Sequence, residues 1–217
     1  MSSRPRLEDY LTTIYRLEEA LGVAKITDIS RELEVSPASA SKVVKRLESK
    51  GLVTRKKYHY VTLTDAGRKL AESIIRKHRI AEQFLSQMLG FDDYSSHVYA
   101  HYLEHVPEVV IEKLHQVLGF PSMCPHGNPL PGTQVSEDNS TRLSVVKEGS
   151  KCVVVRLLGE LRELLEFIRR TPVRVGSVLS ITARSQNSVV VRVEDRGELI
   201  DIPLRIARLI MVRCSEP

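Results

Sequence analysis

The chain has 217 residues, a length that favours two or three compact domains over a single one. Hydrophobic residues make up 42% and charged residues 27%, the net charge is a modest +5, and there is no low-complexity run, which excludes an intrinsically disordered chain. No apolar run approaches the roughly 20 residues of a membrane-spanning helix, and MSSRPRLEDY lacks the apolar core of a signal peptide, so we expect a cytoplasmic protein without a membrane partner.

The first part of the chain predicts a helix-turn-helix. Residues 7–21 place their apolar side chains at helical spacing, and residues 26–34 do the same over a shorter stretch. Ser36 as N-cap, Pro37 in the first turn and Gly51 just past the end then mark another helix. Two short helices joined by a tight turn form a common DNA-reading motif, although such pairs also occur in purely structural roles.

Residues 52–64 alternate in polarity and are rich in β-branched and aromatic residues, which predicts a hairpin that would serve as a wing. Residues 36–60 also concentrate lysine and arginine against the single acid Glu48, and such a basic patch suits the phosphate backbone of DNA. Each cation alone has a solvated helix face as its alternative explanation. The predicted base-reading residues are Ser36, Pro37, Ala38, Ser39 and Lys42, with Thr27 as a further DNA contact, and the predicted phosphate or minor-groove contacts are Lys45, Lys50, Arg55, Lys56, Lys57 and His59.

A long helix is predicted after the wing. Residues 65–89, capped by Thr64, would make about seven helical turns. This is longer than a domain of this size needs for its own core, so we expect the apolar face of the helix to serve a partner subunit. The segment VPEVVIEKLHQVLG predicts another helix, and the prolines and glycines of PSMCPHGNPLPGT end regular structure.

The stretch HVYAHYLEHV, residues 97–106, is rich in side chains that bind metals. If it is helical, one stripe of the helix carries His97, His101, Glu104 and His105. The preceding long helix adds His78 and Glu82, four residues apart and on one face. One histidine alone would more often be a partly buried structural residue, but this grouping favours a metal site. Mixed imidazole and carboxylate ligands prefer Fe(II), Mn(II), Co(II), Ni(II) or Zn(II) over Mg(II) or Ca(II).

From about residue 140 the apolar residues recur with period two, which predicts a small β-barrel. The predicted strands lie in KCVVVRLL, SVLSITAR, SVVVRVED and ARLIMVRC. One helical insertion, GELRELLEFIRR, carries Glu160 and Glu163 three residues apart, and a solvated face is the default interpretation of this pair.

The three cysteines are sparse and odd in number, which indicates reduced thiols and no disulfide framework. Cys152 and Cys214 lie within apolar strands, so we expect them in the core. In the segment before the barrel, Cys124 and His126 are either a soft ligand pair or part of a structural turn with a buried thiol.

The chain contains, in this order, the winged helix-turn-helix, the motifs RKHRIAEQFL and HVYAHYLEHV, the linker CPHGNPLPG and the terminal barrel. This arrangement resembles the DtxR/MntR family of metal-dependent transcriptional repressors. The resemblance covers nearly the whole chain. It implies an α+β fold with a DNA-binding domain over residues 1–70, an all-α metal-binding and dimerisation domain over 71–139, and a FeoA-like, SH3-like β-barrel over 140–217.

The resemblance also implies two metal sites. The primary site would use Asp9, His101, Glu104 and His105. The ancillary site would use His78, Glu82 and His97, completed either by Glu160 and Glu163 of the barrel or by Cys124 and His126 of the linker. The family commonly has Cys or Glu at the position of His101, and a second acid of its manganese branch is replaced here by Thr12, so the choice between Fe(II) and Mn(II) stays open.

These features lead to the hypothesis of a homodimer, without enzymatic activity or an organic cofactor, that binds an operator of dyad symmetry when Fe(II) or Mn(II) is plentiful. Co(II), Ni(II) and Zn(II) are expected to substitute in vitro. One alternative is a metalloenzyme with an open coordination position, which leaves the basic wing without a role. The other is a winged-helix regulator that senses an organic ligand, with histidines that pair across the dimer.

Overall fold

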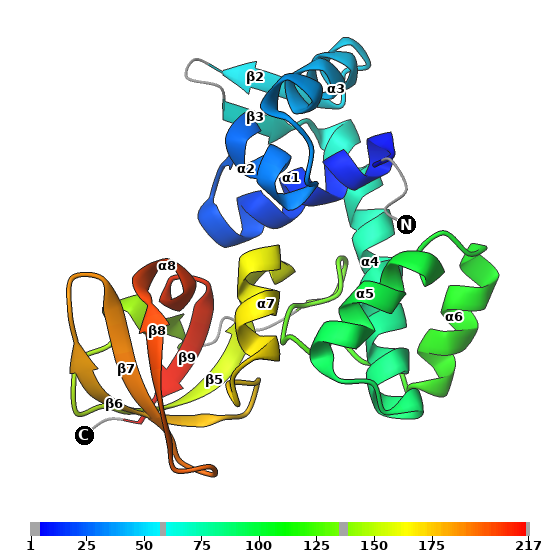
Figure 1. Cartoon of the computed structure of the whole chain (residues 1–217). Helices are drawn as coiled ribbons and strands as arrows, with labels where there is room; N and C mark the ends of the chain where they lie inside the picture. The colour runs from blue at the N-terminus through cyan, green and yellow to red at the C-terminus, as the bar shows by residue number, and fades with distance from the viewer. Residues whose placement is uncertain (1–4, 57–59, 135–138, 216–217) are drawn as a thin grey trace.

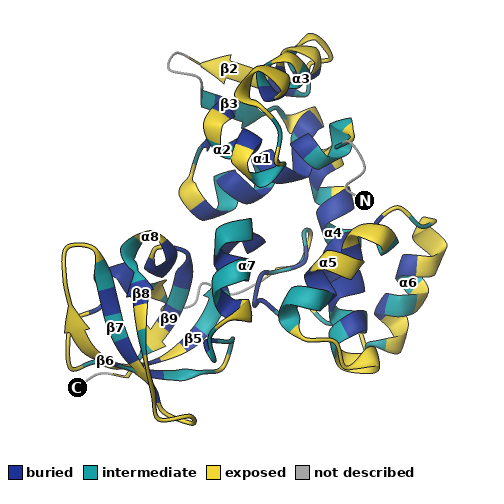
Figure 2. Cartoon of the chain, in the orientation of Figure 1, coloured by how far each residue is buried: buried dark blue, intermediate teal, exposed yellow. Residues whose placement is uncertain are grey.

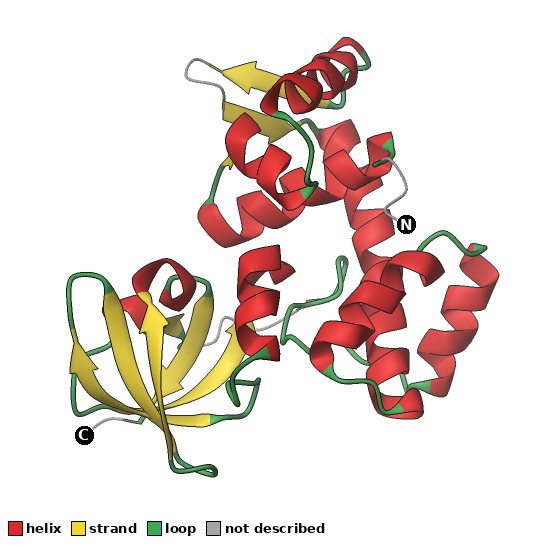
Figure 3. Cartoon of the chain, viewed as in Figure 1, coloured by secondary structure: helices red, strands yellow, loops and turns green. Residues whose placement is uncertain are grey.

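The computed structural model describes residues 5–56, 60–134 and 139–215. These residues form a helical N-terminal domain with a small sheet, a helical middle region and a C-terminal antiparallel sheet domain (Figures 1 and 3). The α+β fold class predicted from the sequence is confirmed. Among the described helices, none combines the length and hydropathy needed to cross a membrane.

The N-terminal domain is a winged helix-turn-helix. Its elements are α1 (Leu7–Leu21), β1 (Ala24–Lys25), α2 (Ile26–Glu32), α3 (Pro37–Ser49), β2 (Val53–Lys56) and β3 (Tyr60–Leu63). The Ser36 hydroxyl caps α3 by accepting a hydrogen bond from the Ser39 backbone N–H, as the sequence predicts. Strand β1 was not predicted, because two residues that pair with β3 are too short to show a pattern.

The middle region consists of α4 (Asp65–Leu89), α5 (Asp93–Leu103) and α6 (Glu108–Val117). Thr64 caps α4, and Gly67 lets this helix pack against the chain before the wing, since a Cβ there would lie 1.9 Å from the Leu52 carbonyl oxygen. The prediction of one helical stripe from residue 97 to residue 105 is wrong at its end. Helix α5 stops at Leu103, and residues 104 and 105 lie in a turn ahead of a proline, which disfavours helical backbone in the residue before it.

The C-terminal domain is a six-stranded antiparallel sheet with strand order β4-β9-β5-β6-β7-β8, strongly curved in Figure 1. Its strands are β4 (Thr141–Arg142), β5 (Lys151–Leu157), β6 (Val178–Arg184), β7 (Ser188–Val193), β8 (Glu198–Pro203) and β9 (Ile210–Cys214), with short helices at Leu143–Val145 (η2) and Leu204–Ala207 (α8). Strand β8 was missed, because half of its residues are exposed and it lacks apolar alternation.

The predicted helical insertion has two parts, η3 (Leu158–Glu160) and α7 (Arg162–Arg169). Gly159 and Glu160 both adopt left-handed backbone, with φ of 67° and 47°. The chain therefore turns sharply before α7 begins, and Glu160 and Glu163 do not share a helix face.

The barrel packs directly against α1 of the DNA-binding domain. A Cβ on Gly159 would lie 2.5 Å from the Arg16 carbonyl oxygen, so only glycine permits this approach. The Arg142 guanidinium also donates to the carbonyl of Ala20 at the end of α1, at 2.9 Å. The buried apolar side chains of the two domains form one continuous core, whereas α3 and α6 show largely exposed surfaces (Figure 2).

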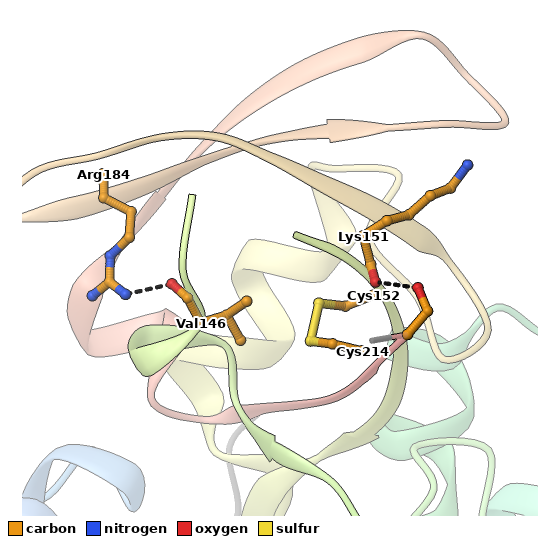
Figure 4. Close-up of a disulfide and its surroundings, with 6 residues drawn as sticks. Val146, Lys151, Cys152, Arg184 and Cys214 are labelled. Carbon is orange, nitrogen blue, oxygen red and sulfur yellow. Dashed lines mark hydrogen bonds between the residues drawn. A yellow bond between two sulfur atoms is a disulfide. The ribbon is translucent and has the colours of Figure 1, made fainter. Parts of the chain in front are cut away.

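Cys152 and Cys214 form a disulfide (Figure 4), so the prediction of reduced thiols is wrong for this pair. The two residues are 62 positions apart, but they lie directly opposite each other on the neighbouring antiparallel strands β5 and β9. Strand register decides this pairing, and the composition that argued for free thiols contains no information about register. Cys124 is a free, buried cysteine.

Candidate metal centre

Six buried side chains from four segments of the chain converge between α4, α5 and the start of α7. This inner cluster consists of His78, Glu82, His97, Cys124, His126 and Glu160. Its ligand atoms form two overlapping groups, in each of which all atoms lie within 4.8 Å of one another. Glu82 and Glu160 belong to both groups, so the helical histidines and the linker residues share one centre.

Glu82 lies at the middle of the inner cluster. Its Oε1 is 3.0 Å from Nε2 of His78 and 2.7 Å from Nδ1 of His97. Its other oxygen, Oε2, is 3.6 Å from Nδ1 of His126. Helical spacing places His78 and Glu82 on one face of α4, and α5 packs His97 against that face. The sequence predicted this face correctly.

Glu160 enters the cluster because the chain turns before α7. Its Oε1 accepts hydrogen bonds from Asn128 at 2.8 Å and from Arg79 at 3.2 Å, and the Cys124 thiol donates to the same oxygen at 3.4 Å. Glu163 lies three residues later on the outer face of α7, where its partly exposed side chain pairs with Arg205. The structure thus brings Glu160 to the centre and leaves Glu163 outside it.

The linker turn is held tightly against the barrel. Gly127 has a φ of 74°, and a Cβ there would lie 2.2 Å from the Val155 carbonyl oxygen. The Asn128 amide donates to the Leu157 carbonyl at 2.8 Å, and the Leu157 backbone N–H donates to the His126 carbonyl at 2.9 Å. The turn is therefore structural, and it also presents Cys124 and His126 to the cluster.

A second, outer cluster consists of Asp9, Glu104 and His105, whose ligand atoms lie within 4.8 Å of one another. Asp9 is in the first turn of α1 and also accepts a hydrogen bond from the Arg6 backbone N–H at 2.6 Å. Glu104 is buried, whereas 30% of the His105 side chain is exposed. Ligands from the DNA-binding domain and from the middle region thus meet at this point.

His101 does not join the outer cluster. It groups with His78 and His97, and its Nδ1 lies 3.4 Å from Glu104. Glu104 in turn is 2.6 Å from Nδ1 of His78. Glu104 and His101 therefore link the two clusters, and three of the four expected primary ligands lie together.

Burial and hydrogen bonding set the ionisation of the inner cluster. Burial alone would lower the pKa of His78, but Glu82 and Glu104 outweigh it and raise that pKa to about 9. Burial lowers the pKa of His97 to about 3, against its hydrogen bond with Glu82. Burial raises the pKa of the Cys124 thiol well above its ordinary value.

The carboxylates remain ionised despite burial. Burial and the charge of Glu82 work against ionisation of Glu160, but Arg79 and Arg16 bring its pKa down to about 2. Hydrogen bonds from His101 and His78 overcome burial and hold the pKa of Glu104 far below its usual range. The cluster therefore presents charged oxygen ligands in a low-dielectric setting.

Several polar atoms of the inner cluster lack a hydrogen-bond partner in the part of the chain that the structure describes. They are Oε2 of Glu82, Oε2 of Glu160 and both ring nitrogens of His126. Buried polar atoms without partners are costly, and these four lie where a coordinated cation would satisfy them. Nitrogen, oxygen and sulfur ligands together suit Fe(II), Mn(II), Co(II), Ni(II) or Zn(II). The residues present fit a divalent transition metal.

A cavity of about 650 Å³ lies beside both clusters. Its walls come from α1, the end of α2, α5 and the segment around Glu160, and they include Asp9, His101 and Glu104. The cavity gives an ion access to side chains that are otherwise buried.

The DNA-contact residues predicted from the sequence lie on the surface wherever the structure describes them. The exposed ones are Thr27, Ser36, Pro37, Ala38, Ser39, Lys42, Lys45, Lys50, Arg55 and Lys56, while Lys57 and His59 lie outside the described residues. Arg55 pairs with Glu48 at 2.7 Å. The exposed face of α3 and the wing therefore carry the basic patch together.

Sequence reasoning missed three buried polar residues around the inner cluster. Arg79 and Asn128 orient Glu160, and Arg16 lies 3.6 Å from its second oxygen. Arg79 lies next to the predicted ligand His78, and Asn128 lies within the CPHGNP motif, so their positions in the sequence could have indicated a role near the cluster. Nothing in the pattern of α1 distinguished Arg16 from a surface cation.

Known proteins match the chain along nearly its whole length. Family models match as the iron dependent repressor N-terminal DNA binding domain (residues 4–61), the iron dependent repressor metal binding and dimerisation domain (64–132) and the FeoA domain (141–214). The diphtheria toxin repressor of Corynebacterium glutamicum is 32% identical over 207 residues, which cover 89% of this chain and 91% of that protein.

Solved structures show the same relationship. The crystal structure of IdeR from T. acidophilum has a TM-score of 0.83 and 30% identity, and the match covers 98% of this chain and 100% of that one. A manganese-dependent transcriptional repressor in complex with manganese has a TM-score of 0.80 and 28% identity, with 97% and 100% coverage. The resemblance inferred from the sequence is confirmed, and the chain belongs to the family of iron-dependent repressors that includes diphtheria toxin repressor and IdeR, a family of metal-dependent transcriptional repressors.

Proposed function

We propose that this chain is a repressor that binds operator DNA as a homodimer when Fe(II) or Mn(II) is bound, and that it controls genes of metal uptake or homeostasis in the cytoplasm. The observation that carries the proposal is the outer cluster, where Asp9 of the DNA-binding domain meets Glu104 and His105 of the middle region. A ligand set divided between two domains is suited to fixing their relative position.

Each cluster has its own part in this proposal. Asp9, Glu104 and His105 would hold one ion, with His101 beside them, and the inner cluster would hold another. Each bound ion would supply positive charge to the ligands of its own cluster. Arg79 and Asn128 keep Glu160 pointed at the inner cluster, and the buried turn around Gly127 keeps Cys124 and His126 in place.

A second copy of the chain is the partner we infer for the middle region. The end of α4 and helices α5 and α6 expose large apolar side chains, among them Met88, Leu89, Phe91, Tyr99, Tyr102 and Val109. Large apolar groups gathered on one region typically mark an interface. A twofold dimer would present two α3 helices to an operator of dyad symmetry, and their separation would decide which half-site spacing fits.

The energy required is within reach of one metal site. A roughly hundredfold change in operator affinity needs about 2.7 kcal/mol of preference of the ion for the DNA-binding arrangement. Asp9 joins Glu104 and His105 only when α1 lies against the turn after α5. An ion would bind weakly to these ligands when they are apart, so the complete set can supply such a preference.

Selection from a random duplex library, followed by binding measurements on the selected sequence, tests the proposal. Under anaerobic conditions, fluorescence anisotropy should show tight binding with Fe(II) or Mn(II) and weak binding with chelator. Sequences with dyad symmetry should be enriched. Operator affinity that is equal with metal and with chelator would refute the proposed function.

A further inference from the structure

Arg16 is a buried cation that α1 places inside the metal centre. It lies seven residues after Asp9, so both side chains project from the same face of the helix, Asp9 toward the outer cluster and Arg16 toward Glu160 of the inner one. Only 10% of the Arg16 side chain is exposed. Its Nε has no hydrogen-bond partner among the described residues.

The two arginines beside Glu160 are held very differently. Arg79 donates to Glu19 at 2.7 Å, to the Pro129 carbonyl at 2.6 Å and to Glu160 at 3.2 Å. The closest ion-pair contact of Arg16 is Nη2 to Glu160 Oε2 at 3.6 Å, which is longer than a hydrogen bond. Arg79 is therefore fixed in place, and Arg16 is not.

Arg16 and an ion in the inner cluster would share one carboxylate oxygen. The Arg16 guanidinium lies 3.6 Å from Oε2 of Glu160, which has no hydrogen-bond partner among the described residues, whereas Arg79, Asn128 and Cys124 all donate to Oε1. The positive charge of Arg16 therefore lies beside the oxygen that is free to coordinate an ion, and like charges repel strongly in a buried site.

We propose that Arg16 competes with the metal ion for Glu160 and leaves the inner cluster when the ion binds. This inference rests on the proposed function, because it presupposes that the centre binds a divalent ion. The cavity beside the clusters gives the side chain a path, since Arg16 lines it together with Glu32 and Glu34 of the α2 end. Arg16 would move toward these carboxylates and away from the barrel.

The competition would set the metal concentration at which the inner cluster fills. Arg16 belongs to α1, the helix that also carries Asp9 of the outer cluster. An ion in the inner cluster would release one contact between α1 and the barrel, the Arg16–Glu160 pair, whereas an ion in the outer cluster would bind Asp9. Filling of the inner cluster would therefore act on the same helix that supplies a ligand to the outer cluster.

Metal affinity of the full chain, measured without DNA, tests this inference. Competition between the protein and a chromophoric chelator for Mn(II) and Co(II) should show about tenfold tighter binding by Arg16→Gln than by the unsubstituted chain, because a buried repulsive charge is removed. Arg16→Lys keeps the charge and should bind about as the unsubstituted chain does. The inference would be overturned if Arg16→Gln bound metal no more tightly than the unsubstituted chain. It would also be overturned if Arg16→Lys bound metal as tightly as Arg16→Gln.

A second measurement needs no substitution and decides the matter if Arg16→Gln does not fold. Phenylglyoxal modifies accessible arginines, and mass spectrometry locates the modified residues. Arg16 should be protected with chelator and modified with Mn(II), while exposed Arg31 reacts and buried Arg79 does not in both conditions. Protection of Arg16 in the presence of bound Mn(II) would overturn the inference alone, whereas absence of any Mn(II) binding would refute the proposed function.

Discussion

The inner and outer clusters share Glu104 as a neighbour but differ in how completely they are assembled. All six inner residues are buried, and Glu160 is fixed by Asn128 and Arg79. In the outer cluster Asp9 is half-buried in the first turn of a helix, and His105 lies in a turn. The inner ligands are held within packed segments, whereas the outer ligands lie at the first turn of α1 and in the turn after α5.

This difference indicates that the two clusters have different roles. A preformed site spends little of its binding energy on reorganisation, so an ion there binds tightly and mainly stabilises the fold. A site that must bring two segments together spends part of that energy on positioning them, so its occupancy can shift the arrangement of domains. We therefore expect the inner cluster to govern stability and the outer cluster to govern DNA binding.

Glu160→Gln should have the largest effect on the metal-free protein. Removing the charge leaves Arg79 and Arg16 without their shared carboxylate, and breaking a buried ion pair costs about 3 kcal/mol or more in the free energy of unfolding. Urea denaturation in the presence of chelator measures this loss.

Glu163→Gln is the matched control, because it makes the same chemical change three residues away. Glu163 and Arg205 form an exposed pair, and such pairs contribute about 1 kcal/mol or less. Equal destabilisation by the two substitutions would contradict the placement of Glu160 at the centre and Glu163 outside it.

Asp9→Asn should affect DNA binding and leave the inner cluster intact. At saturating Mn(II), operator affinity should fall about a hundredfold toward its metal-free value, because the ion loses its ligand on α1. Fluorescence anisotropy with the selected operator measures this change. The free energy of unfolding should stay within about 1 kcal/mol of the unsubstituted chain, as for a partly exposed side chain.

Glu8→Gln serves as the control on the same helical turn. Glu8 is nearly half exposed and lies 3.6 Å from His105, so its charge is largely screened by solvent. Its operator affinity should change by no more than about twofold, within the range of a weak surface pair. A hundredfold loss in Glu8→Gln, or none in Asp9→Asn, would show that Asp9 has no special part in coupling metal to DNA binding.

Local features of the sequence predicted much of the fold and the types of ligand. The N-caps at Ser36 and Thr64 and the His78–Glu82 face of α4 follow from hydrogen bonding and helical spacing within a few residues. The motif CPHGNP likewise indicated its two ligand candidates, which the structure places against Glu82 and Glu160.

The features that the sequence did not reveal depend on contacts between distant residues. Positive φ at Glu160 turns its side chain inward, and this backbone geometry follows from the packing of Gly159 on α1. The Cys152–Cys214 disulfide depends on strand register across 62 positions. Arg16 looks like any surface cation until the barrel covers it.

Cys124→Ser should have the smallest effect, and it distinguishes the clusters by chemistry, because the inner cluster has the only sulfur among the described ligand groups. A thiolate prefers Co(II) and Zn(II) to Mn(II), so the substitution should weaken Co(II) binding about tenfold and Mn(II) binding much less. The thiol is protonated without metal, since burial raises its pKa, and coordination by Co(II) would require loss of that proton. A thiolate-to-Co(II) charge-transfer band in the near ultraviolet would report the bond.

The band should be present in the unsubstituted chain, absent in Cys124→Ser and retained in Asp9→Asn. Retention follows because Asp9 belongs to the outer cluster, where no sulfur ligand is present. Loss of the band in Asp9→Asn would mean that the two clusters assemble as one unit, and the division between a stabilising and a regulating site would fail. If the band persisted in Cys124→Ser, another thiolate would have to bind Co(II). The other two cysteines of the described chain, Cys152 and Cys214, form a disulfide, so they could supply a thiolate only after reduction.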